Sequence, residues 1–162
     1  MEIGEAYQGG IIAYILQQGD EGYDTKVTHG IIAAPVDQST GIAWWNGSYS
    51  TTGPTGTALG TGQANTTAIV ANQGAGSYSA SICAAYSVIV GATTYNDWYL
   101  PCKDELNKLY LNRVVIGGLA NSTYWSSSEF SFDDAWAQSS LIGTQASVNK
   151  LNAFGVRAVR SF

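Results

Sequence analysis

The chain has 162 residues and a formal net charge of −5; 45% of its residues are hydrophobic and only 12% are charged. This length is typical of a single domain, and 5 Trp and 10 Tyr supply ample apolar surface for a core. The 7 Lys and Arg residues are scattered along the chain, so the composition argues against nucleic acid, sulfated glycans and anionic membranes as partners.

The first third of the chain predicts β-structure. Residues 9–16 (GGIIAYIL) and 29–36 (HGIIAAPV) are apolar and β-branched, which is typical of strands, and a polar turn at 17–24 joins them. Residues 41–49 (GIAWWNGSY) predict a further short aromatic strand. The Gly- and Thr-rich stretch 50–63 predicts a long surface loop that packing keeps ordered.

The middle of the chain predicts helices. Residues 64–74 begin with Asn and Thr and stop at Gly, which are helix boundary signals. Residues 77–90 place Ile82, Ala85 and Tyr86 at helical spacing. A short buried strand is expected at 97–101, which ends at proline.

The clearest helix is predicted at 102–113. A proline precedes it, Asp104 and Glu105 lie in its first turn, and Arg113 lies in its last turn. This order of charges complements the helix dipole. Its inner face is expected to consist of Leu106, Leu109 and Tyr110.

The chain then returns to strands at 124–130, 135–140 and 155–162. Apolar residues alternate unevenly in the last of these, and Arg157 and Arg160 are expected to point outward or to pair with acids. Strands followed by helices and then strands again indicate an α+β fold. No repeat or domain boundary is apparent, so 1–162 is interpreted as one domain.

Neither a membrane span nor a leader peptide is predicted. The apolar run 9–16 is far shorter than the roughly 20 residues that a membrane helix needs. The acidic start of the chain already resembles domain sequence. We therefore expect no membrane insertion, and we interpret the chain as the C-terminal domain of a longer protein.

Residue patterns for catalysis or metal binding are sparse. The single histidine, His29, precedes a predicted strand and is interpreted as a structural or surface residue. No Gly-x-Ser-x-Gly motif is present, and no cysteine has a histidine in sequence reach. The carboxylates at 19–24 are too few for a calcium loop. We expect no enzymatic activity, metal or cofactor. Cys83 and Cys102 form either two buried free thiols or a disulfide.

Several blocks in one order carry a family resemblance: YQGGIIAYIL, NDWYLPCKDELNKLY, TYWSSSE, AWAQ and VRAVRSF. Together they resemble the C-type-lectin-like domains of bacteria and phages, in the branch that also resembles formylglycine-generating enzymes. The likeness covers nearly the whole chain. It implies a C-type lectin-like fold: a small twisted antiparallel sheet, two to three flanking helices and much irregular structure.

Three functional branches follow from the resemblance. The oxidase branch uses a closely spaced cysteine pair late in the chain, whereas the cysteines here stand at 83 and 102. The calcium-lectin branch uses Glu-Pro-Asn-type and Trp-Asn-Asp motifs, and neither occurs here. The third branch consists of the variable proteins of diversity-generating retroelements.

In such variable proteins, randomised adenines of Asn codons yield most residue types but never Trp, Met, Lys, Gln or Glu. Between 130 and 156 only four residues belong to these unreachable types: Trp136, Gln138, Gln145 and Lys150. They are interpreted as fixed scaffold positions. The stretch 139–155 has no helical period and no clean strand alternation. The exposed apolar residues of 130–154 would reduce solubility unless they bind a ligand.

The resemblance therefore implies a variable ligand-binding surface at about 130–154. Its predicted contact residues are Phe130, Phe132, Asp133, Asp134, Ala137, Ser139, Ser140, Leu141, Ile142, Thr144, Ser147, Val148, Leu151, Ala153 and Phe154. The predicted scaffold around it includes Trp98, Trp125, Trp136, Arg157 and Arg160.

The expected partner is a protein or glycan ligand on a cell surface. The domain would stand on a phage tail or fibre tip, or on a bacterial surface structure such as a pilus tip. The alternative is an adhesin of the same fold with a constant binding surface. The sequence leaves the ligand, the parent protein and the oligomeric state open.

Overall fold

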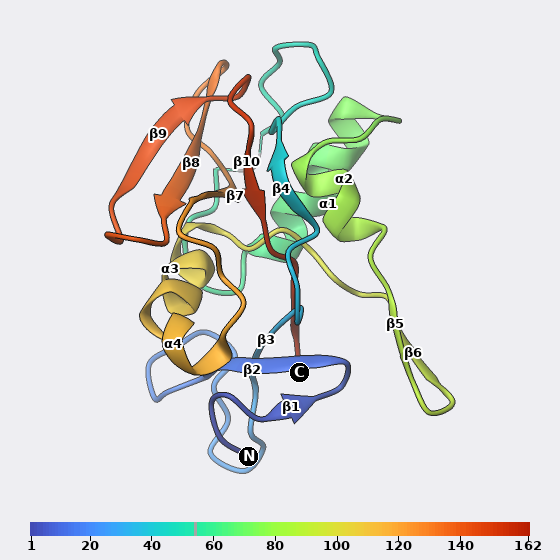
Figure 1. The fold of residues 1–162 in the computed structure, drawn as a ribbon, viewed down its shortest axis with the longest axis vertical. Helices are drawn as coiled ribbons and strands as arrows, with labels where there is room; N and C mark the ends of the chain where they lie inside the picture. Colours follow the sequence, from blue (N-terminus) through green and yellow to red (C-terminus); the bar gives the residue numbers. More distant parts are fainter. Residues whose placement is uncertain (54) are drawn as a thin grey trace.

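The computed structural model describes residues 1–53 and 55–162 and shows an α+β architecture. Figure 1 shows a four-stranded sheet at one end of the molecule, with both chain termini beside it, and a larger sheet at the other end. The first sheet is antiparallel and its strands run in the order β1 (Ala6–Tyr7), β2 (Gly10–Ile15), β3 (Gly30–Ala33) and β11 (Val159–Ser161).

The larger sheet has five strands in the order β4 (Ser39–Ile42), β10 (Phe154–Val156), β7 (Thr123–Glu129), β8 (Asp134–Ser139) and β9 (Gln145–Asn149). Its β10–β7 pair is parallel and its other pairs are antiparallel. A purely antiparallel sheet was expected. The parallel pair arises because the chain, after the β8–β9 hairpin, returns to the other edge of β7.

A third sheet is a separate hairpin of β5 (Val88–Val90) and β6 (Thr93–Tyr95), which projects from the body in Figure 1. It corrects the helix that was expected at 77–90, because helix α2 (Ser79–Ala84) ends before it. The run Val88, Ile89 and Val90 is β-branched at every position, and such side chains favour strands over helices.

The remaining helices of the described residues are α1 (Gly62–Gln73), α3 (Lys103–Leu111) and α4 (Arg113–Ile116). The α3 helix begins as its sequence predicts. Its Glu105 carboxylate accepts a 2.7 Å hydrogen bond from the backbone N–H of Cys102, which caps the first turn. Leu106 and Leu109 are buried on its inner face.

Three predicted strands differ in extent from the observed ones. The segment 155–162 forms two strands in different sheets, with Arg157 and Ala158 between them. The aromatic strand at 41–49 ends at Ile42, so both of its tryptophans lie beyond it. The segment 97–101 contributes only an isolated bridge from Tyr99 to Val159.

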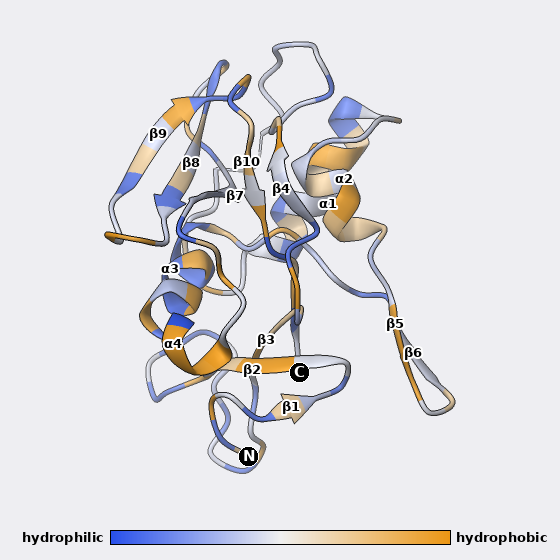
Figure 2. Ribbon diagram, in the orientation of Figure 1, coloured by the Kyte–Doolittle hydropathy of each residue, from blue (hydrophilic) through white to orange (hydrophobic). Residues whose placement is uncertain are grey.

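The core lies between the two larger sheets and the helices, and aromatic side chains dominate it. Trp98 and Trp125 are buried, as the sequence predicts for scaffold residues. The indole N–H of Trp125 donates to the carbonyl of Ile42 across 2.9 Å. Figure 2 shows hydrophobic stretches on β2 and on the helices, and also at the turn between β8 and β9.

Arg157 and Arg160 pair with acids. The Nε atom of Arg157 lies 2.6 Å from Asp37, and that of Arg160 lies 2.7 Å from Asp97. Cys83 and Cys102 are both buried and free. In the described part of the chain, every helix is too short or too polar to cross a bilayer.

Candidate ligand-binding surface

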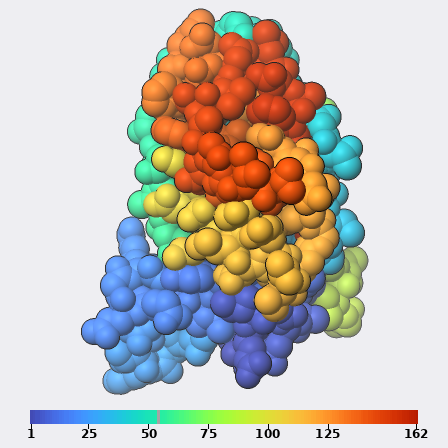
Figure 3. Space-filling model, turned by 60° about the vertical axis from the view of Figure 1, so that its left-hand side comes forward, coloured from blue at the N-terminus to red at the C-terminus, as the bar shows by residue number. Residues whose placement is uncertain are grey.

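Residues 130–154 form one continuous region around the β8–β9 hairpin. In the space-filling view of Figure 3 they cover the upper part of one face, above α3. The exposed members of the predicted contact set are Phe130, Phe132, Asp133, Leu141, Ile142, Thr144, Leu151 and Ala153. The half-buried members are Asp134, Ser139, Ser147, Val148 and Phe154.

Two predicted contact residues are buried, which corrects their assignment. Ala137 stands opposite Trp125 in the β7–β8 register and faces the core. The hydroxyl of Ser140 lies 2.9 Å from the carbonyl of Ser122 and accepts a 3.0 Å hydrogen bond from the N–H of that residue. Neither side chain can reach a ligand, because packing or hydrogen bonding holds each one inside the fold.

Two half-buried members also support the core. The Phe154 ring lies 4.7 Å from the Trp125 ring, and Val148 packs against the same cluster of buried residues. Each therefore offers a ligand only part of its surface, and truncating either side chain is expected to destabilise the fold.

The exposed contact residues gather at the two ends of the hairpin. One group, here the loop end, comprises 130–133 and 150–153, where β7 turns into β8 and β9 leads to β10. The other, the turn end, comprises 141–144. The five residues of β9 separate the two ends by roughly 15 Å. In Figure 1 the loop end lies far from both termini, and the turn end lies beside α3.

At the turn end, the backbone favours glycine at position 143. Gly143 has φ +80°, and a Cβ atom there would stand only 2.4 Å from the ring of Tyr110. L-residues rarely adopt that backbone conformation. The turn is therefore fixed by Gly143, while Leu141 and Ile142 beside it are 58% and 69% exposed.

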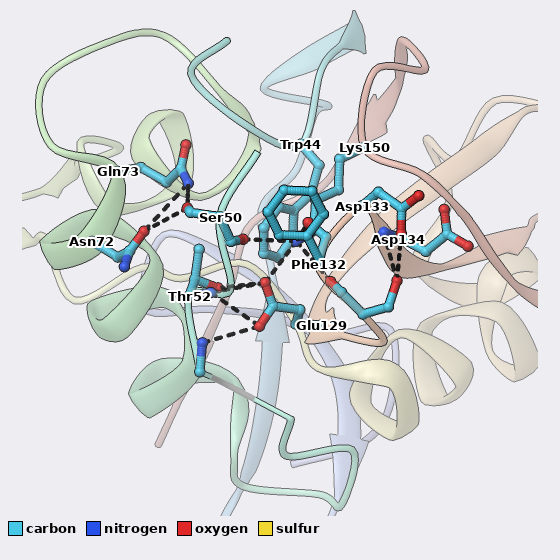
Figure 4. A network of polar contacts seen from close by, with 12 residues as sticks. Trp44, Ser50, Thr52, Asn72, Gln73, Glu129, Phe132, Asp133, Asp134 and Lys150 are labelled. Carbon is cyan, nitrogen blue, oxygen red and sulfur yellow. Dashed lines mark hydrogen bonds and ion pairs between the residues drawn. The ribbon is translucent and has the colours of Figure 1, made fainter. Parts of the chain in front are cut away.

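The four residues interpreted as fixed scaffold positions all anchor the hairpin or its loops: Trp136, Gln138, Gln145 and Lys150. Lys150, at 1% exposure, is the most buried of them. Figure 4 shows its ammonium group at the centre of a polar network. The Nζ atom lies 2.6 Å from Glu129 Oε1 and 2.8–3.2 Å from three backbone carbonyls, those of Phe132, Ser131 and Ser50.

Glu129 completes this network. Its carboxylate accepts hydrogen bonds of 2.9 Å from the N–H of Thr52 and 3.0 Å from the N–H of Gly53. The hydroxyl of Thr52 adds a third, at 3.1 Å. The Lys150–Glu129 pair therefore joins three loops: 44–53, 130–133 and 150–153.

The other three anchors fasten the hairpin to α3. Gln138 donates to Asn107 Oδ1 across 2.8 Å, and Gln145 donates to the carbonyl of Lys103 across 2.8 Å. The ammonium of Lys103 lies 3.6 Å from the centroid of the Trp136 ring, a cation–π contact. The backbone of the hairpin is thus held by residues that face α3 rather than solvent.

Sequence reasoning missed the loop 44–53, which lies beside the loop end. Its Tyr49 hydroxyl donates to Asn149 Oδ1 across 2.8 Å, and its Tyr49 ring lies 5.6 Å from that of Phe132. The sequence held a signal: Asn46-Gly47 is a turn dipeptide, which places the aromatic residues around it on a loop rather than a strand.

The described residues contain no group of three or more His, Cys, Asp or Glu side chains placed to hold a metal ion. Burial raises the pKa of the Cys102 thiol to about 12 and also raises the pKa of Cys83. Because only the thiolate is a good nucleophile, burial disfavours the reactive form of both cysteines.

In comparisons with known proteins, no family model matches the chain, and no curated protein matches it.

Proposed function

We propose that this chain is a ligand-binding domain of C-type lectin-like fold, of the kind that resembles formylglycine-generating enzymes, and that a retroelement diversifies its surface at about 130–154. The α+β architecture with long irregular segments supports the fold assignment. The sequence blocks that carry the resemblance form β2, α3, β7, most of β8, and β11.

One observation carries the proposal. Within 130–154, each of the four residues that Asn-codon randomisation cannot produce has a side chain that anchors the hairpin or its loops. The large apolar side chains between them are mostly free: Phe130, Phe132, Leu141, Ile142 and Leu151 are each more than half exposed. Anchors of constant type with free side chains between them suit a surface whose residues change while its backbone does not.

The ligand is a protein or glycan on another cell's surface. Exposed aromatic and aliphatic side chains supply the anchors of such an interface, and the Ser, Thr, Asn and Asp residues among them supply polar contacts. No cofactor takes part and no reaction follows binding. The domain acts at a phage tail or fibre tip, or on a bacterial surface structure. Both of its termini lie at the end opposite the loop end, so an attachment there would leave the loop end free to meet a ligand.

The test is deep sequencing of codons 120–162 and their downstream flank across one bacterial or phage population. We expect substitutions at exposed positions such as Phe132, Leu141 and Leu151, and constant Trp136 and Lys150. A near-copy template and a reverse transcriptase gene should lie nearby.

An invariant segment without a template would contradict diversification. The constant adhesin of the same fold would then replace it, and binding would be sought on glycan arrays.

A further inference from the structure

The loop 44–53, here the aromatic loop, adjoins the loop end along most of its length. The backbone N–H of Trp44 donates to the carbonyl of Lys150 across 3.1 Å. The Lys150 ammonium lies 3.2 Å from the carbonyl of Ser50. At the far end of the aromatic loop, Thr52 and Gly53 bind the Glu129 carboxylate. The aromatic loop lies outside the segment that the retroelement would rewrite.

Three aromatic rings run from this loop onto the variable surface. The rings of Trp45 and Tyr49 are stacked with centroids 4.1 Å apart, and the rings of Tyr49 and Phe132 follow at 5.6 Å. Exposure rises along the series, from 9% for Trp45 through the half-buried Tyr49 to 56% for Phe132. A ligand that covers Phe132 must therefore also approach Tyr49.

The aromatic loop is held from both sides. On the side of α1, the N–H of Asn46 donates to Gln73 Oε1 across 3.0 Å, and Gln73 donates to the hydroxyl of Ser50 across 2.7 Å. On the other side stands the Lys150–Glu129 pair. Tyr49 is thus preorganised, and a preorganised aromatic residue binds with little loss of conformational entropy.

We propose that the aromatic loop is the constant half of the ligand-binding surface, and that Tyr49 contacts any protein ligand that binds at the loop end, whatever residue stands at 132. The inference rests on the proposed function. A protein ligand is favoured because the loop end exposes large apolar side chains, Phe130, Phe132 and Leu151, at more than 50% each. Buried aromatic residues are common energetic centres of protein interfaces.

The experiment uses a display library of the full chain. Positions 130, 132, 151 and 153 are randomised, since all four are exposed at the loop end, and binders are selected separately against lysozyme, streptavidin and serum albumin. Each selected binder then receives Tyr49→Ala or Tyr49→Phe. The matched control is Tyr23→Ala, because Tyr23 is a 40% exposed tyrosine in the loop between β2 and β3.

We expect Tyr49→Ala to raise Kd about 10-fold or more in most binders to all three proteins. Tyr49→Phe keeps the ring and removes only the partly buried hydrogen bond to Asn149, so it should raise Kd less than about 3-fold. Tyr23→Ala should leave Kd unchanged. Thermal unfolding of each variant separates lost contact from lost fold.

A second measurement needs no substitution. Hydroxyl-radical footprinting of an unsubstituted binder should show Tyr49 protected in the complex and Tyr23 labelled equally with and without ligand. Binders in which Tyr49→Ala has no more effect than Tyr23→Ala, with Tyr49 unprotected, would overturn this inference and leave the proposed function standing. A folded library that yields no binder to any of the three proteins would overturn the protein ligand assumed in this inference and would leave a glycan ligand for the proposed function.

Discussion

The two larger sheets are stabilised in different ways. In the four-stranded sheet, every residue of β3 is buried, and Ile12 on β2 and Ile32 on β3 have no exposed surface. The five-stranded sheet instead buries polar side chains along its central strand. Strand β7 buries three consecutive serines and Glu129, and Lys150 is buried beside them.

The buried polar groups of β7 are all satisfied. Ser126 donates to the carbonyl of Trp136 across 2.7 Å, and Ser128 donates to the carbonyl of Gly56 across 2.7 Å. Within the described residues, no buried side-chain nitrogen or oxygen is without a partner. Most of these bonds join a side chain to a backbone N–H or carbonyl group, so they fix the course of the chain whatever side chains its neighbours carry.

This difference shows how one domain can hold a constant core and a changeable surface. Close packing makes each apolar side chain depend on its neighbours' shapes, so the four-stranded sheet tolerates few substitutions. Hydrogen bonds from a few anchors to the backbone place no such demand on exposed neighbours. Substitutions in the two sheets can test this contrast.

The largest effect is expected at the polar centre. Lys150→Met removes the cation and leaves the Glu129 carboxylate buried at 1% exposure, so it should lower the free energy of unfolding by about 3–5 kcal/mol. Urea denaturation measures the change. Lys26→Met is the control, because Lys26 is exposed on the loop between β2 and β3, and it should change stability by less than about 0.5 kcal/mol.

The double variant Glu129→Gln, Lys150→Met distinguishes a charge effect from a size effect. It removes both charges together, so it should be more stable than Lys150→Met alone. If the double variant were less stable than the single one, the loss in Lys150→Met would not come from the uncompensated charge of Glu129. The contrast between the two sheets would then lose its electrostatic basis.

The second prediction compares apolar residues of the two regions. Ile32→Ala removes a fully buried side chain and should cost about 2–5 kcal/mol. Leu141→Ser, Leu151→Ser and Phe132→Ser change side chains that are 56–59% exposed and should each cost less than about 1 kcal/mol. The same urea titrations provide the values. Losses above 2 kcal/mol at all three exposed sites would place them in the core and remove the argument for a binding surface.

Much of the fold could be predicted from the sequence, because in β2, β3 and α3 the local sequence signals agree with the tertiary contacts. Apolar β-branched runs predicted β2 and β3, and the proline, acids and arginine around α3 predicted that helix. Trp98 and Trp125 were correctly assigned to the core. The exposure of Leu141 and Ile142 also followed from the sequence. They lie in a stretch without helical or strand periodicity, so no regular element places them on a buried face.

What the sequence could not supply depended on long-range contacts. Adjacent serines at 139 and 140 look alike, yet only Ser140 meets the carbonyl of Ser122. The aromatic loop became part of the site through two distant contacts: Lys150 lies 100 residues after Ser50, and Phe132 lies 83 residues after Tyr49. Parallel pairing of β10 with β7 likewise has no local signature.

The two serines give the third prediction. Ser140→Ala removes a buried hydroxyl that accepts from the N–H of Ser122 across 3.0 Å and donates to the carbonyl of Ser122 across 2.9 Å, and the loss of both hydrogen bonds should cost about 1–3 kcal/mol. Ser139→Ala alters a half-buried hydroxyl at the edge of the hairpin and should cost less than about 1 kcal/mol. Thermal unfolding of the two variants compares them. Equal losses would mean that Ser140 is as replaceable as its neighbour and belongs with the variable residues.

The smallest effect is expected at the Arg160–Asp97 pair, beside the four-stranded sheet. The Arg160 guanidinium lowers the pKa of the Asp97 carboxyl, so the pair stabilises the fold above the ordinary Asp pKa of about 4 and loses that contribution as the pH falls below it. Because the Asp97 side chain is 46% exposed, solvent screening keeps the contribution below about 1 kcal/mol. Asp97→Asn should therefore lower Tm slightly at pH 7 and converge with the parent chain at pH 2–3, as melting curves across this range would show. A constant difference in Tm at every pH would assign the effect to packing rather than charge. The stability of the four-stranded sheet would then owe nothing to this ion pair.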